Sequence, residues 1–566
     1  MDNVSVAAIL FDIANMLELK GDNPFRIKSY QRAARTIENL PQEVTRMAKS
    51  GTLRTIPGVG ESIAQKITEL ADTGHIQYYD ELCEEFPEGL RALLSIQGLG
   101  PRTVAMLSKE LGITNATELE AALSDGRVAA LPRMGPQVVE KLLAHVKSSI
   151  ETKGKRIPLG FALNIADDIV TSLMQNEPGI RIVIPTGSLR RMRDTIGDLD
   201  FICVASDSEA AINAFLALPQ VHEVLVRGEQ KVSTITSSGL QMDFRIVPKE
   251  HLGSHLQYST GSKGYNIALR ERAVRRNIKV SEYGITDPEG VLEMFETEEE
   301  FYRALGIQFV SPELREVGPI IEAAEHYKVP ELVRDIDVLG DAHVHSDWSD
   351  GHASLDALHN LGSNMRYRFI VVTDHTQSLG IAHGLSPERL LAQIKEIRRI
   401  NDMYALYSDF RLFAGTEVDI KRDGTLDMPD EILEQLDVVI ASVHSGMNQD
   451  EETMTQRIIS AMRNPHVDVI GHPTCRLIDE RDPVSLNMEA IFQAAKETNT
   501  ALEINGDPAR LDLKDTYAHR ARDLGVKLSL GTDAHYTHQL RNMRLAVATA
   551  RRGWCTKDDI LNCRRT

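Results

Sequence analysis

The chain has 566 residues, of which 42% are hydrophobic and 26% charged, and its formal net charge is −19. This length predicts about three to five domains, and the composition excludes wholesale disorder. No apolar run approaches the roughly 20 residues of a membrane span, no signal peptide is evident, and the five scattered cysteines form no CxxC pair. We therefore expect a cytoplasmic protein without a disulfide framework or a zinc ribbon.

Residues 1–150 carry a helical pattern that glycine turns interrupt three times. The turns are Ile56-Pro57-Gly58-Val59-Gly60, Ile96-Gln97-Gly98-Leu99-Gly100-Pro101 and Leu131-Pro132-Arg133-Met134-Gly135-Pro136. They resemble helix-hairpin-helix motifs, in which N–H groups at a helix N-terminus hold a DNA phosphate without reading the bases. The DNA contacts that this implies are Gly58, Gly60, Gly98 and Gly100. In the third copy Arg133 replaces an expected glycine, and ordinary helix hairpins with glycine turns are the alternative.

A carboxylate pair follows in the middle of the chain. Residues 181–185 read as a strand, Gly187-Ser188-Leu189-Arg190-Arg191 as the start of a helix, and Gly197-Asp198-Leu199-Asp200 as the start of a second strand. Asp198 and Asp200 then point to the same face, and the helix start with its two arginines suits a triphosphate. Apolar and polar residues alternate over residues 241–246, so Asp243 can join the pair from a neighbouring strand.

Three carboxylates suit two Mg²⁺ or Mn²⁺ ions about 3.5–4 Å apart, which clamp the attacking and leaving oxygens of a phosphoryl transfer. The alternative is that these are carboxylates at strand and loop edges. Further on, basic residues gather between Lys263 and Lys279. A solvated helix face is one explanation for them, and we favour contact with DNA.

The last 230 residues or so alternate short apolar strands with helices at a spacing near 30 residues, which predicts a parallel sheet or a (β/α) barrel. Strands are expected around 369–372, 412–414, 438–443, 467–470, 501–504 and 527–530. Histidine and carboxylate residues cluster just after them, where a barrel brings strand ends together at one mouth. Imidazole with carboxylate suits Zn²⁺, Mn²⁺ or Fe²⁺. A single strand-end histidine is more often structural, but this many in one arrangement predicts a metal centre.

The stretch from Arg156 to Arg270 resembles the catalytic core of the family X DNA polymerases. The resemblance rests on Lys155-Arg156-Ile157-Pro158, the GSxRR and GDxD blocks above, Met242-Asp243-Phe244-Arg245 and Tyr258-Ser259-Thr260-Gly261-Ser262. It implies that Asp198, Asp200 and Asp243 bind the catalytic metals, with Asp243 accepting the primer hydroxyl proton. It also implies triphosphate contacts at Arg156, Gly187, Ser188 and Arg191, a sugar and base pocket at Tyr258, Gly261 and Asn266, and a template contact at Arg270.

The first helix-hairpin-helix copy, with Phe25-Arg26-Ile27-Lys28-Ser29-Tyr30 upstream, resembles the small lyase domain of the same family. Lys66 stands where those enzymes keep a Schiff-base lysine, and a lysine near other cations attacks an abasic-site aldehyde more readily. However, Arg26 and Ser62 replace supporting lysines. The alternative is that Lys66 is an exposed helix lysine.

The C-terminal arrangement resembles the PHP (polymerase and histidinol phosphatase) domain. The resemblance implies up to three Zn²⁺, Mn²⁺ or Fe²⁺ ions, with Glu417 as the bridging ligand. The implied ligands are His343, His345, Asp350, His375, Glu417, His444, His472, Asp533 and His535. The order of polymerase core and then PHP domain is similar to that of bacterial and archaeal family X enzymes.

These observations predict a multidomain α+β and α/β chain. We expect a lyase-like helical region at 1–85, a second helix-hairpin-helix region at 86–155, a nucleotidyltransferase palm at 156–250, a nucleotide-selecting subdomain at 251–317, a linker at 318–338 and a barrel-like PHP domain at 339–566. The predicted function is filling of short DNA gaps in repair, with a 3′→5′ exonuclease in the PHP domain and, as further options, 3′-phosphatase, abasic endonuclease and 5′-deoxyribose-phosphate lyase activities.

The predicted partners are gapped or nicked DNA and deoxynucleoside triphosphates, and the chain is expected to act as a monomer away from membranes. Two rival hypotheses remain. In the first, the PHP domain is a phosphoesterase for small phosphate esters and the polymerase core only binds. In the second, the protein is a non-catalytic scaffold at DNA ends.

Overall fold

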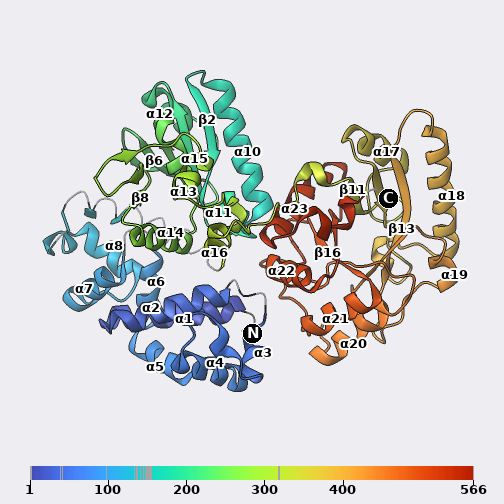
Figure 1. Cartoon of the computed structure of the whole chain (residues 1–566), viewed down its shortest axis with the longest axis horizontal. Coiled ribbons are helices and arrows are strands. Elements are labelled where there is room, and N and C mark those ends of the chain that lie inside the picture. Colours follow the sequence, from blue (N-terminus) through green and yellow to red (C-terminus); the bar gives the residue numbers. More distant parts are fainter. Residues whose placement is uncertain are drawn as a thin grey trace. The chain divides into compact units, whose positions relative to one another are not determined.

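The computed structural model describes residues 3–564 except 39, 41, 97–98, 133, 136–137, 140–141, 144–145, 147–155 and 317–318. The chain forms two compact units, Met1–Val329 and Pro330–Thr566 (Figure 1). Their boundary lies inside the predicted linker, and both sides of it are packed. The amide nitrogen of Gln308 donates 2.9 Å to the carbonyl of Val329 in the first unit, and the backbone N–H of Val333 donates 2.9 Å to Cys555 in the second.

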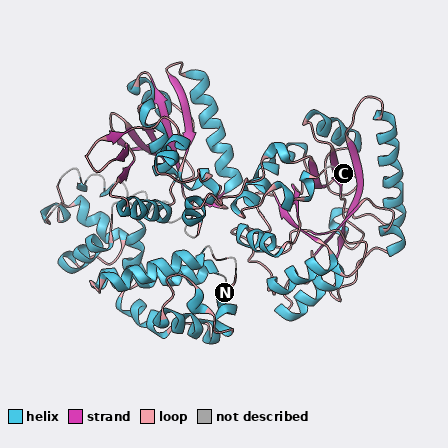
Figure 2. Cartoon of the chain, viewed as in Figure 1, coloured by secondary structure: helices cyan, strands magenta, loops and turns pink. Residues whose placement is uncertain are grey.

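The N-terminal region is helical, as predicted, and its helices range from 5 to 18 residues (Figure 2). They are α1 (Asn3–Lys20), α2 (Pro24–Glu38), α3 (Val44–Lys49), α4 (Glu61–Thr73), α5 (Gln77–Glu85), α6 (Glu88–Ala92), α7 (Pro101–Leu111) and α8 (Ala116–Ser124). Helices α4 and α7 end at Gly74 and Gly112, whose left-handed backbone favours glycine and whose N–H groups close the last turn.

The middle of the first unit is a five-stranded sheet with the order β2-β4-β7-β6-β5. The strands are β2 (Ile180–Pro185), β4 (Asp198–Ala205), β5 (Glu223–Arg227), β6 (Lys231–Ile235) and β7 (Gln241–Ile246). Helices α10 (Leu159–Asn176) and α12 (Ser208–Leu216) pack against it, and Phe215 stacks on Phe244 with ring centroids 4.5 Å apart. In β7, buried and half-buried residues alternate, which confirms the predicted period of two.

Residues 249–316 form a smaller α+β region of the first unit. It contains α13 (Leu252–Thr260), α14 (Lys263–Arg275), α15 (Glu298–Ala304) and a sheet of β8 (Lys279–Ser281), β9 (Gly284–Thr286) and β10 (Leu292–Glu293). Helix α15 begins with a capping box, in which Thr297 and Glu300 each accept a hydrogen bond from the other's backbone N–H. The unit also contains the short elements α11 (Gly187–Arg190), β1 (Ile157–Pro158), β3 (Thr195–Ile196) and α16 (Ile320–Glu325).

The second unit is a seven-stranded parallel sheet in simple chain order, so the predicted barrel is confirmed. Its strands are β11 (Gly340–Val344), β12 (Phe369–Val372), β13 (Arg411–Asp419), β14 (Val438–Ser442), β15 (Val469–Ile470), β16 (Ala501–Asn505) and β17 (Leu528–Gly531). Its helices are α17 (Leu355–Asn364), α18 (Pro387–Tyr404), α19 (Asp430–Leu433), α20 (Glu451–Met462), α21 (Met488–Thr498), α22 (Asp515–Leu524) and α23 (Met543–Arg552).

The first and last strands almost close this barrel. The backbone N–H of Asp533 donates 2.9 Å to His343, and that of His345 donates 2.9 Å to Ala534. At the other end, the buried amide of Asn562 donates to Gly340 on one strand and to Leu530 on the other, at 2.9 and 2.8 Å. None of the described helices combines the length and the apolar character that a bilayer span requires.

Candidate functional site

The three predicted carboxylates of the first unit come together on two adjacent strands. Strands β4 and β7 run parallel, and Asp200 lies directly opposite Asp243 in their register. Asp198 is on the same face, two residues earlier in β4. Gly187 begins α11 with φ +61°, and a Cβ atom there would lie 2.6 Å from Asp200 Oδ2. A residue without a side chain therefore lets this turn approach the carboxylates.

The carboxylates differ in their electrostatic surroundings. Burial, together with Asp198 and Asp243, raises the pKa of Asp200 to about 7. Burial and Asp243 also raise the pKa of Asp198. Burial acts the same way on Asp243, but the Lys231 ammonium, 2.5 Å from Asp243 Oδ2, outweighs it and lowers the pKa. Asp243 is thus the weaker base in this arrangement, and its role as proton acceptor stays a prediction.

This oxygen-only cluster fits the predicted Mg²⁺ or Mn²⁺. Both ions favour carboxylate ligands. Besides burial, repulsion from the neighbouring carboxylates raises the pKa of Asp198 and Asp200, and a divalent cation would relieve that repulsion. The sequence interpretation missed Lys231, because nothing local shows that β6 lies beside β7.

Two of the predicted triphosphate contacts are arginines held beside the carboxylates. Arg156 Nε donates 2.8 Å to Thr195 Oγ1, and its charge counteracts the effect of burial on the pKa of Asp198. Arg191 Nη1 donates 2.5 Å to the carbonyl of Thr260 and also favours the ionised form of Asp198. Ser188 follows Gly187 in α11. The structure therefore gathers these residues, and their contact with a triphosphate remains a prediction.

The residues predicted for the sugar and base pocket lie close together, and their contact with a nucleotide remains a prediction. Asn266 Nδ2 donates 2.7 Å to the carbonyl of Tyr258, and Arg270 Nε donates 3.2 Å to the carbonyl of Asn266. The Arg270 guanidinium lies 5.9 Å from the centre of the Tyr258 ring, which is 38% exposed. Gly261 is at the turn between α13 and α14 with φ +71°, and a Cβ atom there would lie 3.1 Å from Arg191 Nη1.

A buried ion network connects this region to α11. Glu298 accepts hydrogen bonds from Arg190, at 2.6 Å, and from the fully buried Arg315. Arg190 also donates 2.7 Å to Thr260 Oγ1. Burial opposes ionisation of Glu298, but the two arginines outweigh it and lower its pKa. The network therefore depends on one carboxylate that neutralises two guanidinium groups.

Replacing Glu298 by glutamine should destabilise the first unit by about 3–5 kcal/mol, because it leaves Arg315 buried without a counter-charge. The measurement is the urea midpoint of the full-length variant against wild type. The double variant Glu298→Gln/Arg315→Met should recover part of the loss. An unchanged midpoint in the single variant would contradict this account of the network.

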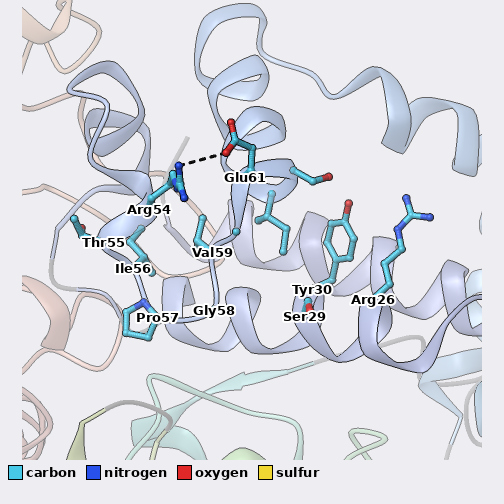
Figure 3. A pocket seen from close by; sticks show the side chains of 13 residues that line it. Arg26, Ser29, Tyr30, Arg54, Thr55, Ile56, Pro57, Gly58, Val59 and Glu61 are labelled. Carbon is cyan, nitrogen blue, oxygen red and sulfur yellow. Dashed lines mark ion pairs between the residues drawn. The ribbon is translucent and has the colours of Figure 1, made fainter.

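The helix-hairpin-helix glycines lie where the motif requires them, as far as the structure describes them. Gly60 precedes α4, and Gly100 precedes α7. Gly58 has φ +93°, and a Cβ atom there would lie 2.9 Å from Arg32 Cγ. Gly98 and Arg133 lie outside the described residues. The turn before α4 forms one wall of a cleft of ≈ 750 Å³, which Arg26, Tyr30 and Arg54 also line (Figure 3).

Lys66 lies on α4 beside this cleft. Its Nζ donates 3.2 Å to Ser62 Oγ and is 4.9 Å from the centre of the Tyr78 ring, over which Arg26 also lies at 5.2 Å. Burial and the positive charge of Arg26 lower the pKa of Lys66. Both the aromatic contact and the pKa shift are absent from an ordinary solvated helix lysine.

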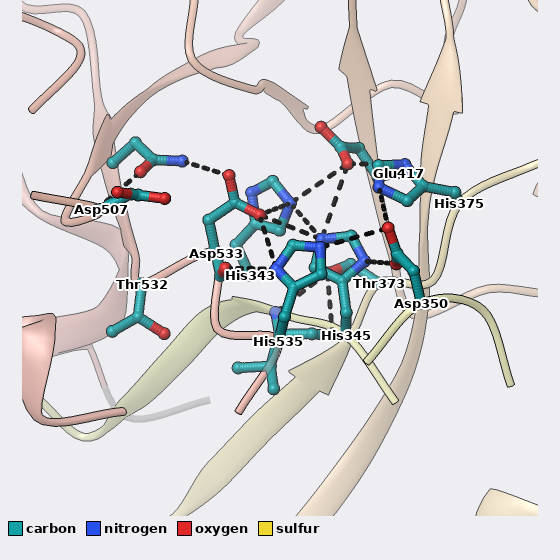
Figure 4. A network of polar contacts seen from close by, with 12 residues as sticks. His343, His345, Asp350, Thr373, His375, Glu417, Asp507, Thr532, Asp533 and His535 are labelled. Carbon is teal, nitrogen blue, oxygen red and sulfur yellow. Dashed lines mark hydrogen bonds and ion pairs between the residues drawn. The ribbon is translucent and has the colours of Figure 1, made fainter. Parts of the chain in front are cut away.

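In the second unit, all nine predicted metal ligands gather around one mouth of the barrel. Figure 4 shows seven of them, which are His343, His345, Asp350, His375, Glu417, Asp533 and His535. Eight of them fall into three groups whose ligand atoms lie within 4.8 Å of one another. The groups are His345–Asp350–His375–His535, His343–His345–Asp533 and His375–Glu417–His444. The ninth residue, His472, places Nε2 2.8 Å from Glu417 Oε1. Glu417 lies within β13 rather than after it, because that strand runs five residues beyond its predicted end.

The donor set fits transition metals. Nitrogen and carboxylate oxygen are mixed, and Glu417 lies between imidazoles, with His375 Nδ1 at 3.0 Å and His444 Nε2 at 3.2 Å. Within the described part of the chain, the buried His345 Nδ1 and His472 Nδ1 have no hydrogen-bond partner, and His375 Nδ1 and Glu417 Oε2, 3.0 Å apart, form an ion-pair contact without hydrogen-bond geometry. Such atoms are costly unless something else binds them.

Carboxylates outside the predicted set orient the imidazoles. Glu503 Oε1 lies 2.7 Å from His343 Nδ1, and Asp419 Oδ1 lies 2.7 Å from His444 Nδ1. Burial opposes protonation of His444, but Glu417 and Asp419 raise its pKa to about 10. Partners of this kind fix which nitrogen faces the metal. The sequence marks both positions, since Glu503 is a charge inside an apolar strand and Asp419 shares a face with Glu417, but it does not show which imidazole each carboxylate contacts.

The two units thus define a nucleotidyltransferase-like palm and a metal-dependent phosphoesterase barrel in one chain. Four family models match it: a helix-hairpin-helix domain at 1–76, a SAM-like helix-hairpin-helix tandem at 90–148, a DNA polymerase beta thumb at 255–316 and a PHP domain at 341–507. The DNA polymerase/3′-5′ exonuclease PolX of Bacillus subtilis is 38% identical over 100% of this chain and 98% of its own. The chain belongs to the family X DNA polymerases that carry a PHP domain.

Shorter relatives match only part of the chain. A probable phosphatase of Thermoanaerobacter is 30% identical over 39% of this chain and 89% of its own, and one of Clostridium acetobutylicum is 28% identical over 36% and 81%. Each of these relatives covers less than half of this chain. The hypothesis of a small-molecule phosphoesterase with a binding-only core therefore has weaker support than the polymerase assignment.

Proposed function

We propose that this family X polymerase fills short gaps in DNA by nucleotidyl transfer from deoxynucleoside triphosphates and shortens 3′ ends at its PHP centre. The observation that carries the proposal is the coexistence of two complete and different acidic sites in one chain. One consists of Asp198, Asp200 and Asp243 on adjacent strands, and the other of histidines and carboxylates at the barrel mouth.

In the palm, the three carboxylates would hold two Mg²⁺ or Mn²⁺ ions, which supply charge stabilisation for the attacking and leaving oxygens. Arg156 and Arg191 lie close enough to Asp198 to affect its pKa, so they can also neutralise a triphosphate there. Asn266 and Arg270 fix the backbone and ring of Tyr258, which would form the sugar side of the pocket.

In the barrel, the three groups of ligands would hold up to three Zn²⁺, Mn²⁺ or Fe²⁺ ions, which activate water and bind a phosphate oxygen. Glu503 and Asp419 hold His343 and His444 in the orientation that this needs. The domain divisions expected from the sequence are part of this proposal, with the helix-hairpin-helix regions holding the DNA backbone through Gly58, Gly60, Gly98 and Gly100.

The proposal is tested with a 5′-labelled primer on a gapped duplex, incubated with Mg²⁺ or Mn²⁺, with and without deoxynucleoside triphosphates, and separated by length. Lengthening only with nucleotides supports the polymerase assignment, and shortening without them supports the exonuclease. A primer that neither lengthens nor shortens would refute the proposal, and small phosphate esters would then be the next substrates to test.

A 5′-deoxyribose-phosphate lyase is a second candidate function, and the surroundings of Lys66 favour it. A lysine with a lowered pKa has a larger neutral fraction near pH 8, and only the neutral amine attacks an aldehyde. The adjoining cleft with Arg26 and Arg54 offers positive charge for a 5′-phosphate.

Borohydride should trap wild type on DNA with a 5′-deoxyribose phosphate, and Lys66→Arg should trap at least about tenfold less, because arginine keeps the charge but is never a neutral nucleophile at these pH values. The trapped fraction should rise with pH to a midpoint below that of an ordinary lysine, since the pKa is lowered. Equal trapping by both proteins would assign the reaction to another group.

A further inference from the structure

A large apolar side chain lies exposed beside the mouth of the barrel. Ile381 is 91% exposed, whereas the neighbouring apolar residues Leu379 and Ala382 are half-buried and buried. All three belong to residues 376–385, which follow strand β12 and the predicted ligand His375 and which we call the isoleucine loop. The loops after the strands of a (β/α) barrel surround its mouth, so the isoleucine loop lies on the side where the ligands gather.

The isoleucine loop is compact and closes on His375. Its ends, Thr376 and Leu385, form a parallel β-bridge, and the backbone N–H of Leu385 donates 2.7 Å to the carbonyl of His375. The two arms approach so closely that a Cβ atom at Gly384 would lie 1.9 Å from the carbonyl oxygen of Thr376. Ile381 is therefore exposed by a folded loop rather than by an extended one.

A buried carboxylate attaches the first arm of the loop to the strand that carries Glu417. Asp427 accepts hydrogen bonds from Thr376 Oγ1 at 2.6 Å and from the backbone N–H of Ser378 at 2.9 Å. Its own backbone N–H donates 3.2 Å to the carbonyl of Asp419, and Asp419 ends strand β13, in which Glu417 also lies. The first arm is thus fixed to a second strand with a predicted ligand.

An arginine fixes the second arm of the loop. Arg389 Nη1 donates 2.8 Å to the carbonyl of His383, two residues after Ile381. The other terminal nitrogen of Arg389 donates to the carbonyl of Trp348, which stands between the predicted ligands at positions 345 and 350. The isoleucine loop is therefore connected to parts of the chain at the ends of β11, β12 and β13, and each of these parts carries a predicted metal ligand.

An exposed isoleucine on a fixed backbone is suited to separate stacked bases. Proteins that kink DNA insert apolar side chains, isoleucine among them, between base steps and unstack the bases. Such an insertion requires a backbone that keeps its position against the duplex, and the contacts above hold that of Ile381. The side chain branches at Cβ, so it has few rotamers to lose on contact. Contact with bases would also remove from water an apolar surface that is exposed in the free protein.

We propose that Ile381 is a strand-separating wedge, which inserts at the last base pair of a duplex end and directs the 3′ strand into the barrel mouth. The inference rests on the proposed exonuclease and adds fully paired 3′ ends to its substrates. A terminal base pair must open before its 3′ strand can reach buried ligands such as His343. Single strands and mismatched ends are already open, so they do not need the wedge.

The test compares three 5′-labelled substrates with the same 3′ sequence, incubated with full-length protein and Mn²⁺ in the absence of nucleotides. They are a single strand, a blunt duplex, and a duplex whose terminal pairs are mismatched. Ile381→Ser should shorten the blunt duplex about tenfold more slowly than wild type, because a small polar side chain does not unstack the end, and should shorten the other two at the wild-type rate. Ile381→Leu should recover most of the duplex rate, since leucine is an apolar wedge of similar size.

The matched control is Ile336→Ser at a 78% exposed position elsewhere in the second unit, which should shorten all three substrates normally. An equal loss on all three substrates in Ile381→Ser would show a structural role and overturn the wedge, and so would an unchanged rate on the blunt duplex. If wild type shortened the single strand but not the blunt duplex, the wedge would be overturned while the exonuclease stood. If wild type shortened none of them, the proposed exonuclease would fall, and the wedge with it.

Discussion

Replacing Asp200 by alanine should lower primer extension by at least about 10³-fold while 3′ shortening continues at the wild-type rate. Asp200 is the central carboxylate, opposite Asp243 in the register and two residues after Asp198. Because Lys231 already neutralises Asp243, removal of Asp200 leaves too little negative charge for two divalent ions. The measurement is single-turnover extension on gapped DNA at saturating nucleotide.

The same variant should not be less stable than wild type at pH 8. Burial and the neighbouring carboxylates raise the pKa of Asp200 to about 7, above its value in the unfolded chain. A carboxyl group whose pKa is raised by folding lowers the free energy of unfolding once the pH exceeds its pKa in the unfolded chain. This loss is complete above the pKa in the folded protein, so removing the group restores that free energy. An inactive variant with an undiminished melting temperature would thus assign the loss to chemistry. Asp168→Ala, an exposed aspartate on α10, is the matched control and should extend normally.

Features encoded by adjacent residues were predictable from the sequence. Asp198 and Asp200 share a face because strands alternate, and Asp243 was expected on the other strand because its neighbours alternate too. The nine residues of the metal cluster were found because the carboxyl ends of successive parallel strands meet at one mouth. In both cases a local pattern together with a known architecture was sufficient.

Features that depend on contacts between distant segments were not predicted. Lys231 reaches Asp243 only because β6 pairs with β7, and Glu503 reaches His343 only across the barrel. Residues of this kind change the pKa of a carboxylate in the site or fix the orientation of an imidazole. They cannot be assigned until the strand register and the loop packing are known.

The largest expected effect in the second unit is at Glu417. Glutamine at this position should reduce 3′ shortening by at least about 10²-fold and lower the bound metal content, while primer extension stays at the wild-type level. Glu417 lies at the centre of the cluster, with His375 Nδ1, His444 Nε2 and His472 Nε2 all within 3.2 Å of its oxygens. The surrounding imidazoles hold its pKa well below the usual range despite burial, so it is a carboxylate and not a neutral acid.

Glutamine keeps the size of the side chain and removes only the charge and one metal-binding oxygen, which makes Glu417→Gln a test of electrostatics rather than of packing. The control is Glu452→Gln, an exposed position on α20, which should change neither activity nor metal content. Metal is counted on the purified full-length protein, and shortening is followed on a labelled single strand without nucleotides. If Glu417→Gln kept its metals and still shortened 3′ ends as wild type does, the exonuclease would have to lie outside the barrel mouth. If extension fell as well, the palm would depend on an intact PHP centre, and the two activities would be coupled rather than independent.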